Sequence, residues 1–373
     1  MALSLTADQT RLLHLRAQGL YRPPSESAAD VARIVREAAG LQAQDAAAGM
    51  RAVWARGTGL VVGDVEQARV AARSIVRTWA MRGTLHLVAA ADLRWLLALF
   101  GPVLLRGDRR RRAELGLDDA VCARAMRLMR DAIAHEGPRT RASLAAHLAA
   151  VGIPTAGQAI VHLLYYAVLD GLICQGPDRD GEPAYVLLDT WIAPEPAPAR
   201  PAALAELARR YLAAYGPAGP DDLAAWSGLP KSDVRIAWQG IADDVIAVEA
   251  AGQPAWLLKT HAGWLDAPPP RPIVRLLPSF DTYLLGYRDR SLIVAPEYAR
   301  HIHPGGGILH PTLLVDGRAQ GVWRSGRKRD RLEVVVAPFA DLAPDVQAGL
   351  EAVVADLGRF LGLPADLRLA PVS

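Results

Sequence analysis

The chain has 373 residues, of which 51% are hydrophobic and 22% are charged. This length allows two or three domains with buried cores, and the composition is typical of a soluble globular protein. No stretch approaches the roughly 18 consecutive apolar residues that a membrane-spanning helix needs. The first residues also lack the basic segment and apolar core of a secretory signal. We therefore expect a cytoplasmic protein that does not contact a membrane.

The net charge is only +3, but the basic residues are almost all arginine and gather in clusters. Arginine suits phosphates and base edges better than lysine, because the guanidinium group presents paired donors. A small net charge with local basic clusters favours one polyanion-binding face. The alternative is a solvated surface balanced by acids elsewhere. The clusters are Arg106 with Arg109, Arg110, Arg111 and Arg112, then Arg288 with Arg290, and finally Arg324, Arg327, Lys328, Arg329 and Arg331.

Two cysteines, Cys122 and Cys174, fall in a predicted helix and a predicted strand, with no ligand spacing around either. This pattern indicates buried free thiols and excludes a disulfide framework or a zinc cluster. The histidines are scattered in the same way, apart from the pair His301 and His303. Glycine-rich phosphate loops of the nucleotide-binding kinds are absent. We therefore expect neither a metal ion nor a cofactor.

The first predicted helix begins at Thr6, where Thr6 and Gln9 have the spacing of a capping box. A second helical pattern ends at Gly40, which we interpret as the C′ glycine of that helix. Gln42 and Gln44 follow, and in extended chain residues i and i+2 point the same way. Their two carboxamides could then orient one water or one polar edge without taking up a proton. Two solvated glutamines are the alternative.

Further along the chain, the hydrophobic period changes from helical to extended. Helices are predicted over residues 46–54 and 65–73. Short β-prone runs over residues 75–80 and 84–88 then flank a turn at residues 81–83, which predicts a hairpin. Helices followed by a hairpin are typical of a winged helix.

The same pattern recurs twice. A Gly-Pro pair is followed by Leu-Ala-Ala in both later copies, at Leu144 and at Leu223, which indicates an internal repeat. The second copy has predicted helices at residues 120–135, 142–150 and 157–169, and strands at 172–175 and 184–188. The third copy follows a proline-rich linker at residues 193–198, and has helices at 204–215, 220–227 and 231–239 and strands at 245–249 and 255–258.

Beyond the three prolines at residues 268–270, the chain is predicted to be β-rich, with a hairpin turn at Asp316 and Gly317. The predicted strands span residues 273–277, 283–286, 312–315, 319–323 and 332–336, and an amphipathic helix at 344–361 closes the chain. The predicted fold class is therefore α+β: three tandem winged-helix domains plus a C-terminal β-rich unit with a closing helix. The predicted domains are residues 1–116, 117–193, 199–267 and 271–373.

Tandem winged helices with arginine clusters favour double-stranded DNA, because a winged helix places a helix in a groove and its wing on the backbone. A protein-docking scaffold is the alternative. Asp281 and Asp289 could be catalytic carboxylates, but Asp289 lies between two arginines and is more simply their ion-pair partner. The residues that we expect at DNA are Arg82, Arg109, Arg110, Arg288, Arg290, His303, Arg327, Lys328 and Arg329.

Four stretches of the sequence resemble a known family over nearly the whole chain. It is the family of bacterial winged-helix DNA glycosylases typified by the azinomycin-resistance enzyme that unhooks DNA interstrand crosslinks. The matching stretches are Gly40-Leu41-Gln42-Ala43-Gln44, Arg77-Thr78-Trp79-Ala80-Met81-Arg82-Gly83-Thr84-Leu85-His86, Pro278-Ser279-Phe280-Asp281 with Gly286-Tyr287-Arg288-Asp289-Arg290, and Pro311-Thr312-Leu313-Leu314-Val315-Asp316-Gly317.

The resemblance implies a monofunctional DNA glycosylase that acts on alkylated purines, chiefly N7-alkylguanine, in double-stranded DNA, including crosslinked purines. The catalytic motif of the family is Gln-apolar-Gln, which falls on Gln42 and Gln44; Asp45 next to them is a candidate helper. A related branch has Asp in the last position of the motif, and this chain does not. We expect a cofactor-free monomer, with a role in antibiotic self-resistance or in general repair. The alternative function is a non-catalytic DNA-binding regulator.

Overall fold

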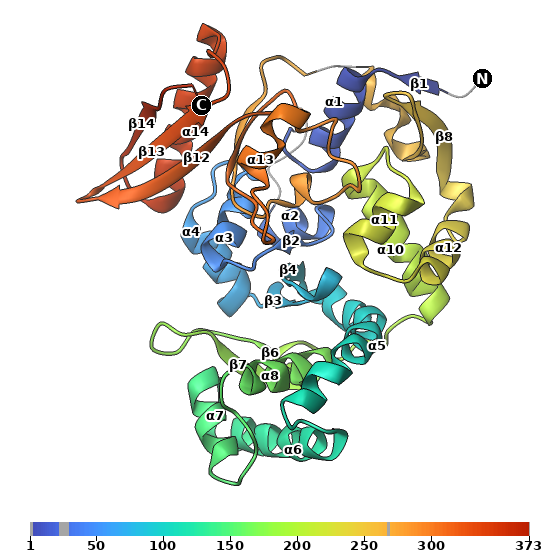
Figure 1. Ribbon diagram of the computed structural model, residues 1–373, viewed down its shortest axis with the longest axis vertical. Coiled ribbons are helices and arrows are strands. Elements are labelled where there is room, and N and C mark those ends of the chain that lie inside the picture. The colour runs from blue at the N-terminus through green and yellow to red at the C-terminus, as the bar shows by residue number, and fades with distance from the viewer. Residues whose placement is uncertain (1–2, 22–29, 267–268, 373) are drawn as a thin grey trace. The chain divides into compact units, whose positions relative to one another are not determined.

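The computed structural model describes residues 3–21, 30–266 and 269–372, and it is a mixture of helices and strands (Figure 1). The predicted α+β class is therefore confirmed. The chain forms two compact units, Met1–Val65 with Leu204–Ser373 as unit 1 and Glu66–Ala203 as unit 2. Residues 267 and 268, where a predicted domain boundary and the predicted proline-rich break fall, lie outside the described residues. The division into four domains stays a prediction.

The first helix of unit 1 is capped at its N-terminus. The Thr6 hydroxyl accepts a hydrogen bond from the backbone N–H of Gln9 at 3.2 Å, and the Gln9 side chain accepts one from the N–H of Thr6 at 2.9 Å. The predicted capping box is therefore confirmed. The elements here are β1 (Leu3–Leu5), α1 (Ala7–Ala17), α2 (Val31–Glu37), β2 (Leu41–Gln42) and α3 (Ala46–Trp54).

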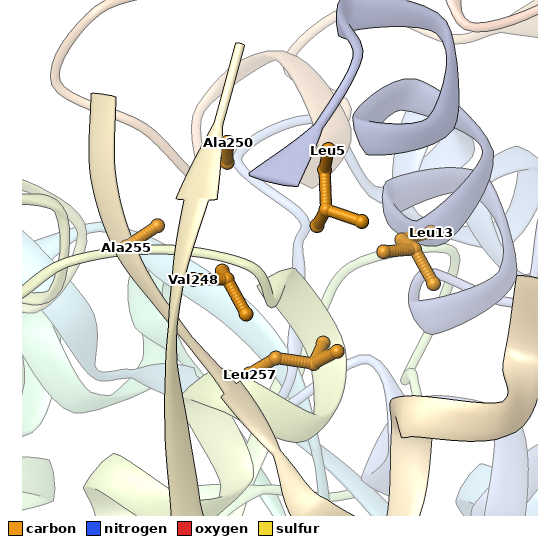
Figure 2. Close-up of a cluster of buried hydrophobic side chains, with 6 residues drawn as sticks. All are labelled: Leu5, Leu13, Val248, Ala250, Ala255 and Leu257. Atoms are coloured by element: carbon orange, nitrogen blue, oxygen red, sulfur yellow. The ribbon is translucent and has the colours of Figure 1, made fainter. Parts of the chain in front are cut away.

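The third predicted winged-helix unit has its helices and hairpin where they were predicted. Strand β1 adds to this hairpin in parallel and was not predicted, since its pairing partner β8 lies far along the chain. Figure 2 shows the cluster behind the sheet, in which Leu5 and Leu13 face Val248 and Leu257. The elements are α10 (Arg200–Tyr215), α11 (Pro220–Ser227), α12 (Lys231–Gln239), β8 (Val245–Ala250) and β9 (Gln253–Leu258).

The C-terminal part of unit 1 is a five-stranded sheet in the order β10-β11-β12-β13-β14, against which α14 packs (Figure 1). The predicted hairpin turn is confirmed, since Asp316 and Gly317 both have positive φ, 49° and 79°. The predicted strand at residues 283–286 is wrong. A 3₁₀ helix over Thr282–Leu284 stands there instead, because the Asp281 carboxylate accepts from the N–H of Tyr283. The elements are β10 (Val274–Leu277), α13 (Ala299–Ile302), β11 (Thr312–Val315), β12 (Arg318–Lys328), β13 (Arg331–Pro338), α14 (Pro344–Leu361) and β14 (Ala365–Leu369).

Unit 2 contains the first predicted hairpin, with Trp79 opposite Leu85, and the helices and wing of the second predicted winged helix. Its longest helix, α5, was not predicted. Gly101 in α5 has a packing role, since a Cβ there would lie 2.5 Å from the carbonyl oxygen of Leu169. The elements are β3 (Ile75–Trp79), β4 (Leu85–Ala89), α5 (Ala90–Glu114), α6 (Asp119–Glu136), β5 (Arg139–Thr140), α7 (Arg141–Ala149), α8 (Ala159–Leu169), β6 (Ile173–Gln175), β7 (Ala184–Leu187) and α9 (Leu188–Trp191), and α4 (Val62–Glu66) leads into the unit.

The fold shows the state of the two cysteines. Cys122 and Cys174 are both free and buried, as predicted. Burial raises the pKa of the Cys174 thiol to about 12, so this thiol is not a reactive thiolate at neutral pH. Within the described residues, no helix has the length and apolar character needed to cross a membrane.

Candidate active site and DNA interface

The Gln-Ala-Gln segment begins where α2 ends in a Schellman motif. The N–H of Gly40 donates to the carbonyl oxygen of Val35, and the N–H of Ala39 donates to that of Arg36, both at 3.0 Å. Ala39 has a φ of 55° and Gly40 a φ of 94°. The prediction that Gly40 is the C′ residue is therefore wrong by one position: Ala39 is C′ and Gly40 is C″. This tight turn fixes the direction in which the chain enters β2.

The two glutamines of the motif lie in different environments. Gln42 is the last residue of β2 and is only 6% exposed. Gln44 lies in a bend beyond the strand and is exposed. The two do not share one extended strand, because β2 ends at Gln42, and the alternation that predicted a common direction applies only within extended chain. The segment thus combines a buried amide with an accessible one, two residues apart.

Asp45 is the N-cap of α3. Its Oδ1 accepts hydrogen bonds from the N–H groups of Ala47 and Ala48, at 2.8 and 3.2 Å. These contacts satisfy two of the donors that the first turn of a helix leaves without intrahelical partners. Asp45 therefore has a structural role in addition to any catalytic one, and it fixes the second end of the Gln-Ala-Gln segment.

Arg51 on α3 is a functional candidate that the sequence prediction missed. Burial lowers its pKa, while the nearby Asp45 carboxylate opposes that shift. Its Nε is shielded from solvent and has no hydrogen-bond partner among the described residues. The side chain thus brings positive charge close to the motif. An arginine seven positions after Gln44 carries no sequence signal of its own, so only the fold could reveal it.

A buried ion pair holds the other end of α3. Both Arg56 and Asp281 are almost fully buried, and two guanidinium nitrogens donate to the two carboxylate oxygens at 2.8 and 2.7 Å. Arg56 also donates to the Gln18 side chain at 2.9 Å. Asp281 further accepts from the N–H of Tyr283. Asp281 is therefore a structural anchor, and the suggestion that it is a catalytic carboxylate is corrected.

An exposed basic feature of unit 1 is the β12–β13 hairpin, which projects from the sheet (Figure 1). Arg327, Lys328 and Arg329 lie at its tip and are all exposed. Arg329 has a φ of 58°, which makes the two-residue turn tight. The nearest acidic contact of Lys328 is with Glu333, at 3.9 Å. The described residues provide no acidic partner for Arg327 or Arg329, so their charges remain available.

In the second predicted DNA-binding cluster, one arginine is ion-paired and the other is half-buried. Arg288 pairs with Asp221 at 2.9 Å rather than with Asp289, whose carboxylate accepts from the N–H of Ser291. The predicted ion-pair role of Asp289 is thus corrected. Arg290 is half-buried, and its Nη1 lies 3.4 and 3.3 Å from the two ring nitrogens of His303.

The electrostatics of this arginine–histidine pair are unusual. Burial, with a contribution from the Arg290 charge, lowers the pKa of His303 to about 4. Burial also lowers the pKa of Arg290. At neutral pH His303 is therefore uncharged, and Arg290 carries the positive charge of the pair beside the loop that contains Gly305.

The remaining predicted DNA-binding residues belong to unit 2. Arg109 lies 3.5 Å from Asp119, and Arg110 lies 3.1 Å from Glu114, so each of these two arginines on α5 has an acidic neighbour. Arg82 has a φ of 55° in the turn between β3 and β4. No group of three or more metal-ligating side chains occurs in the part of the chain that the structure describes.

Comparison with known proteins identifies the family. The family described as DNA glycosylase AlkZ-like matches residues 35–360. The interstrand DNA cross-link repair glycosylase of Streptomyces sahachiroi is 29% identical over 316 residues, which cover 79% of this chain and 81% of that protein. The solved structure of Streptomyces sahachiroi DNA glycosylase AlkZ superposes with a TM-score of 0.83 at 24% identity, over 99% of this chain and 100% of that one. The likeness of the two structures supports the same fold, and the matched family covers most of the sequence, including Gln42 and Gln44. The chain therefore belongs to the AlkZ-like DNA glycosylase family.

Proposed function

We propose that this DNA glycosylase hydrolyses the N-glycosidic bond of N7-alkylated purines, chiefly N7-alkylguanine, and that it unhooks interstrand crosslinks. The similarity to the interstrand DNA cross-link repair glycosylase of Streptomyces sahachiroi supports the second part. An N7-alkylated purine is already cationic, so its bond to C1′ breaks without a strong general acid. Catalysis then requires a positioned water and stabilisation of an oxocarbenium-like sugar.

In this proposal Gln42 and Gln44 hold the water with their side-chain carbonyl oxygens. The observation that carries it is that their segment is fixed at both ends, by the Schellman motif before it and by the Asp45 cap after it. Gln42 is buried and therefore restricted, whereas Gln44 is exposed and can reach a substrate. The first lysine of the chain is Lys231, far from the motif in sequence, which favours a monofunctional enzyme over one that forms a Schiff base.

We also propose that the β12–β13 hairpin and the pair Arg290 and His303 contact the DNA backbone. The exposed charges of the hairpin support this, since phosphate contacts provide most of the sequence-independent affinity for a duplex. In this proposal, the chain also contains three winged-helix modules and the enzyme is a monomer. The recurrence of three helices and a hairpin at α6 to β7 and at α10 to β9 supports the modular part.

The test is single-turnover excision from a duplex that carries one N7-methylguanine, followed by cleavage at the abasic site. We expect Gln42→Ala and Gln44→Ala each to lower the excision rate about a hundredfold, the scale seen when one positioned polar group is removed. Duplex affinity should change little. Gln347→Ala, which removes an exposed glutamine on α14, is the matched control. Full activity in the double variant would refute the assignment, and tight binding without excision by the native protein would favour a regulator.

The helper role of Asp45 can be separated from its capping role. Asn caps a helix as well as Asp does, so Asp45→Asn removes the charge and keeps the cap. We expect this variant to excise N7-methylguanine about tenfold more slowly, with an unchanged melting temperature, since the carboxylate helps to stabilise the cationic sugar. Asp45→Ala should also lower the free energy of unfolding by about 1 kcal/mol. A native rate in Asp45→Asn would leave Asp45 with the capping role alone.

A further inference from the structure

A pocket of about 520 Å³ lies in unit 1, outside the Gln-Ala-Gln segment and the basic hairpin. Three elements of the third predicted winged helix form it: α11, α12 and the β8–β9 wing. Its volume is within the range typical of small-molecule sites. Its walls include Ala224 on α11, Val234 and Trp238 on α12, Val245 on β8 and Trp256 on β9.

Two tryptophans form an aromatic wall of the pocket. The rings of Trp238 and Trp256 are 5.6 Å apart and almost perpendicular, at 85°. This edge-to-face arrangement is a favoured geometry for aromatic pairs. Trp256 is also fixed by two backbone hydrogen bonds with Ala218, at 2.9 and 3.1 Å. The aromatic wall is therefore preorganised for a flat ring.

Two cationic side chains also line the pocket. Lys231 and Arg235 are four residues apart on α12, and residues at this spacing lie on the same face of a helix. Both are exposed, and neither has an ion-pair partner among the described residues. Asp221 also lines the pocket, but its charge is paired with Arg288. An anionic group in the pocket would therefore meet two cations that have no ion pair among the described residues.

We propose that this pocket binds a planar aromatic molecule that carries an anionic group. The ring packs against Trp238 and Trp256, and the anion lies beside Lys231 and Arg235. A helix in the position of α12 could instead enter a DNA groove. The exposed face of α12 is less suited to a DNA groove, since Ile236 on that face is 39% exposed and the adjoining pocket is lined mainly by apolar side chains.

The test uses the full chain and 1-anilinonaphthalene-8-sulfonate, a probe with two aromatic groups and one sulfonate. We expect one bound probe per chain, detected by its fluorescence and by quenching of the tryptophans. Ala224→Leu fills the pocket and should weaken binding at least tenfold. Ala225→Leu, at the next and exposed position of α11, is the matched control and should bind as the native protein does.

A second pair of measurements tests the charges without altering the apolar and aromatic walls of the pocket. Lys231→Gln with Arg235→Gln should weaken binding of the sulfonate probe about tenfold. The same variant should bind uncharged N-phenyl-1-naphthylamine with native affinity. Equal binding by Ala224→Leu and Ala225→Leu would overturn the proposal, and so would displacement of the probe by excess duplex DNA. Because excision of N7-methylguanine is measured separately, failure here leaves the proposed glycosylase function untouched.

Discussion

The arginines of two regions of unit 1 have opposite environments. In the interior, Arg56 is 2% exposed and donates to both oxygens of Asp281. At the tip of the β12–β13 hairpin, Arg327 and Arg329 are exposed and have no acidic partner among the described residues. A buried charge must be paired within the protein, because desolvation without a partner is costly. An exposed one remains available for a polyanion.

This contrast shows that an arginine cluster in a sequence does not by itself identify a DNA-binding surface. Arg110 and Arg111 on α5 form a dense run in the sequence, yet both lie within 3.1 Å of Glu114 oxygens. In the hairpin run, Lys328 and Arg331 contact Glu333 and Asp366, whereas Arg327 and Arg329 have no ion pair among the described residues. What matters for DNA binding is therefore the positive charge that nearby acids leave unneutralised, and this depends on the fold.

The largest effect is expected from the interior pair. Asp281→Ala leaves the Arg56 guanidinium buried without its partner, and breaking such a pair costs about 3–5 kcal/mol of the free energy of unfolding. Urea unfolding measures this loss. The fraction that remains folded should bind duplex DNA with native affinity, since neither residue is at the surface. Stability within 1 kcal/mol of the native value would show that the two regions do not differ as described.

At the hairpin we expect the opposite result, a loss of DNA affinity without a loss of stability. Replacing Arg324, Arg327 and Arg329 together by Gln should lower duplex affinity about 30- to 100-fold at 0.1 M salt, because roughly three phosphate contacts are lost. The slope of log affinity against log salt should become shallower by about 2.7. Fluorescence anisotropy with a random duplex measures both quantities. The melting temperature should stay at the native value, and a large drop in it would mean that these arginines stabilise the fold instead.

Much of the fold could be predicted from local signals. The bounds of α11 and α14 were predicted correctly, since a proline begins each helix and a glycine follows each one. The turn at Asp316 and Gly317 carries its own signature. In these places the residues that set the structure are neighbours in the sequence.

The missed features depend on partners far along the chain. Arg56 and Asp281 are separated by 225 positions, so no spacing rule could pair them. The edge strand β14 forms by parallel pairing with β13, and its composition alone does not predict it. For the site, the sequence located Gln42 and Gln44 through the family resemblance. It could not predict that one is buried and the other exposed, because this follows from where β2 ends.

A smaller effect on stability is expected from pH, because pH changes the charge of histidines but not that of arginines. Burial lowers the pKa of His14 to about 4, below its usual value near 6.5. The unfolded chain thus binds this proton first, and stability present above pH 6.5 is lost as pH falls toward 4. By pH 5.5 the loss is about 1 kcal/mol from this residue. His14→Gln should flatten the dependence in thermal melts.

The smallest effect is expected on α5, where the surface arginines are already paired. Replacing Arg109, Arg110 and Arg111 by Gln removes three positive charges, the same number as in the hairpin variant, but Glu114 and Asp119 already offset part of this charge. We expect duplex affinity to fall less than threefold, and the melting temperature to stay within a degree, since exposed ion pairs contribute little to stability. Anisotropy and thermal melts on both triple variants make the comparison direct. Equal loss of affinity in the two would show that the number of arginines, rather than the charge left after pairing, sets DNA binding.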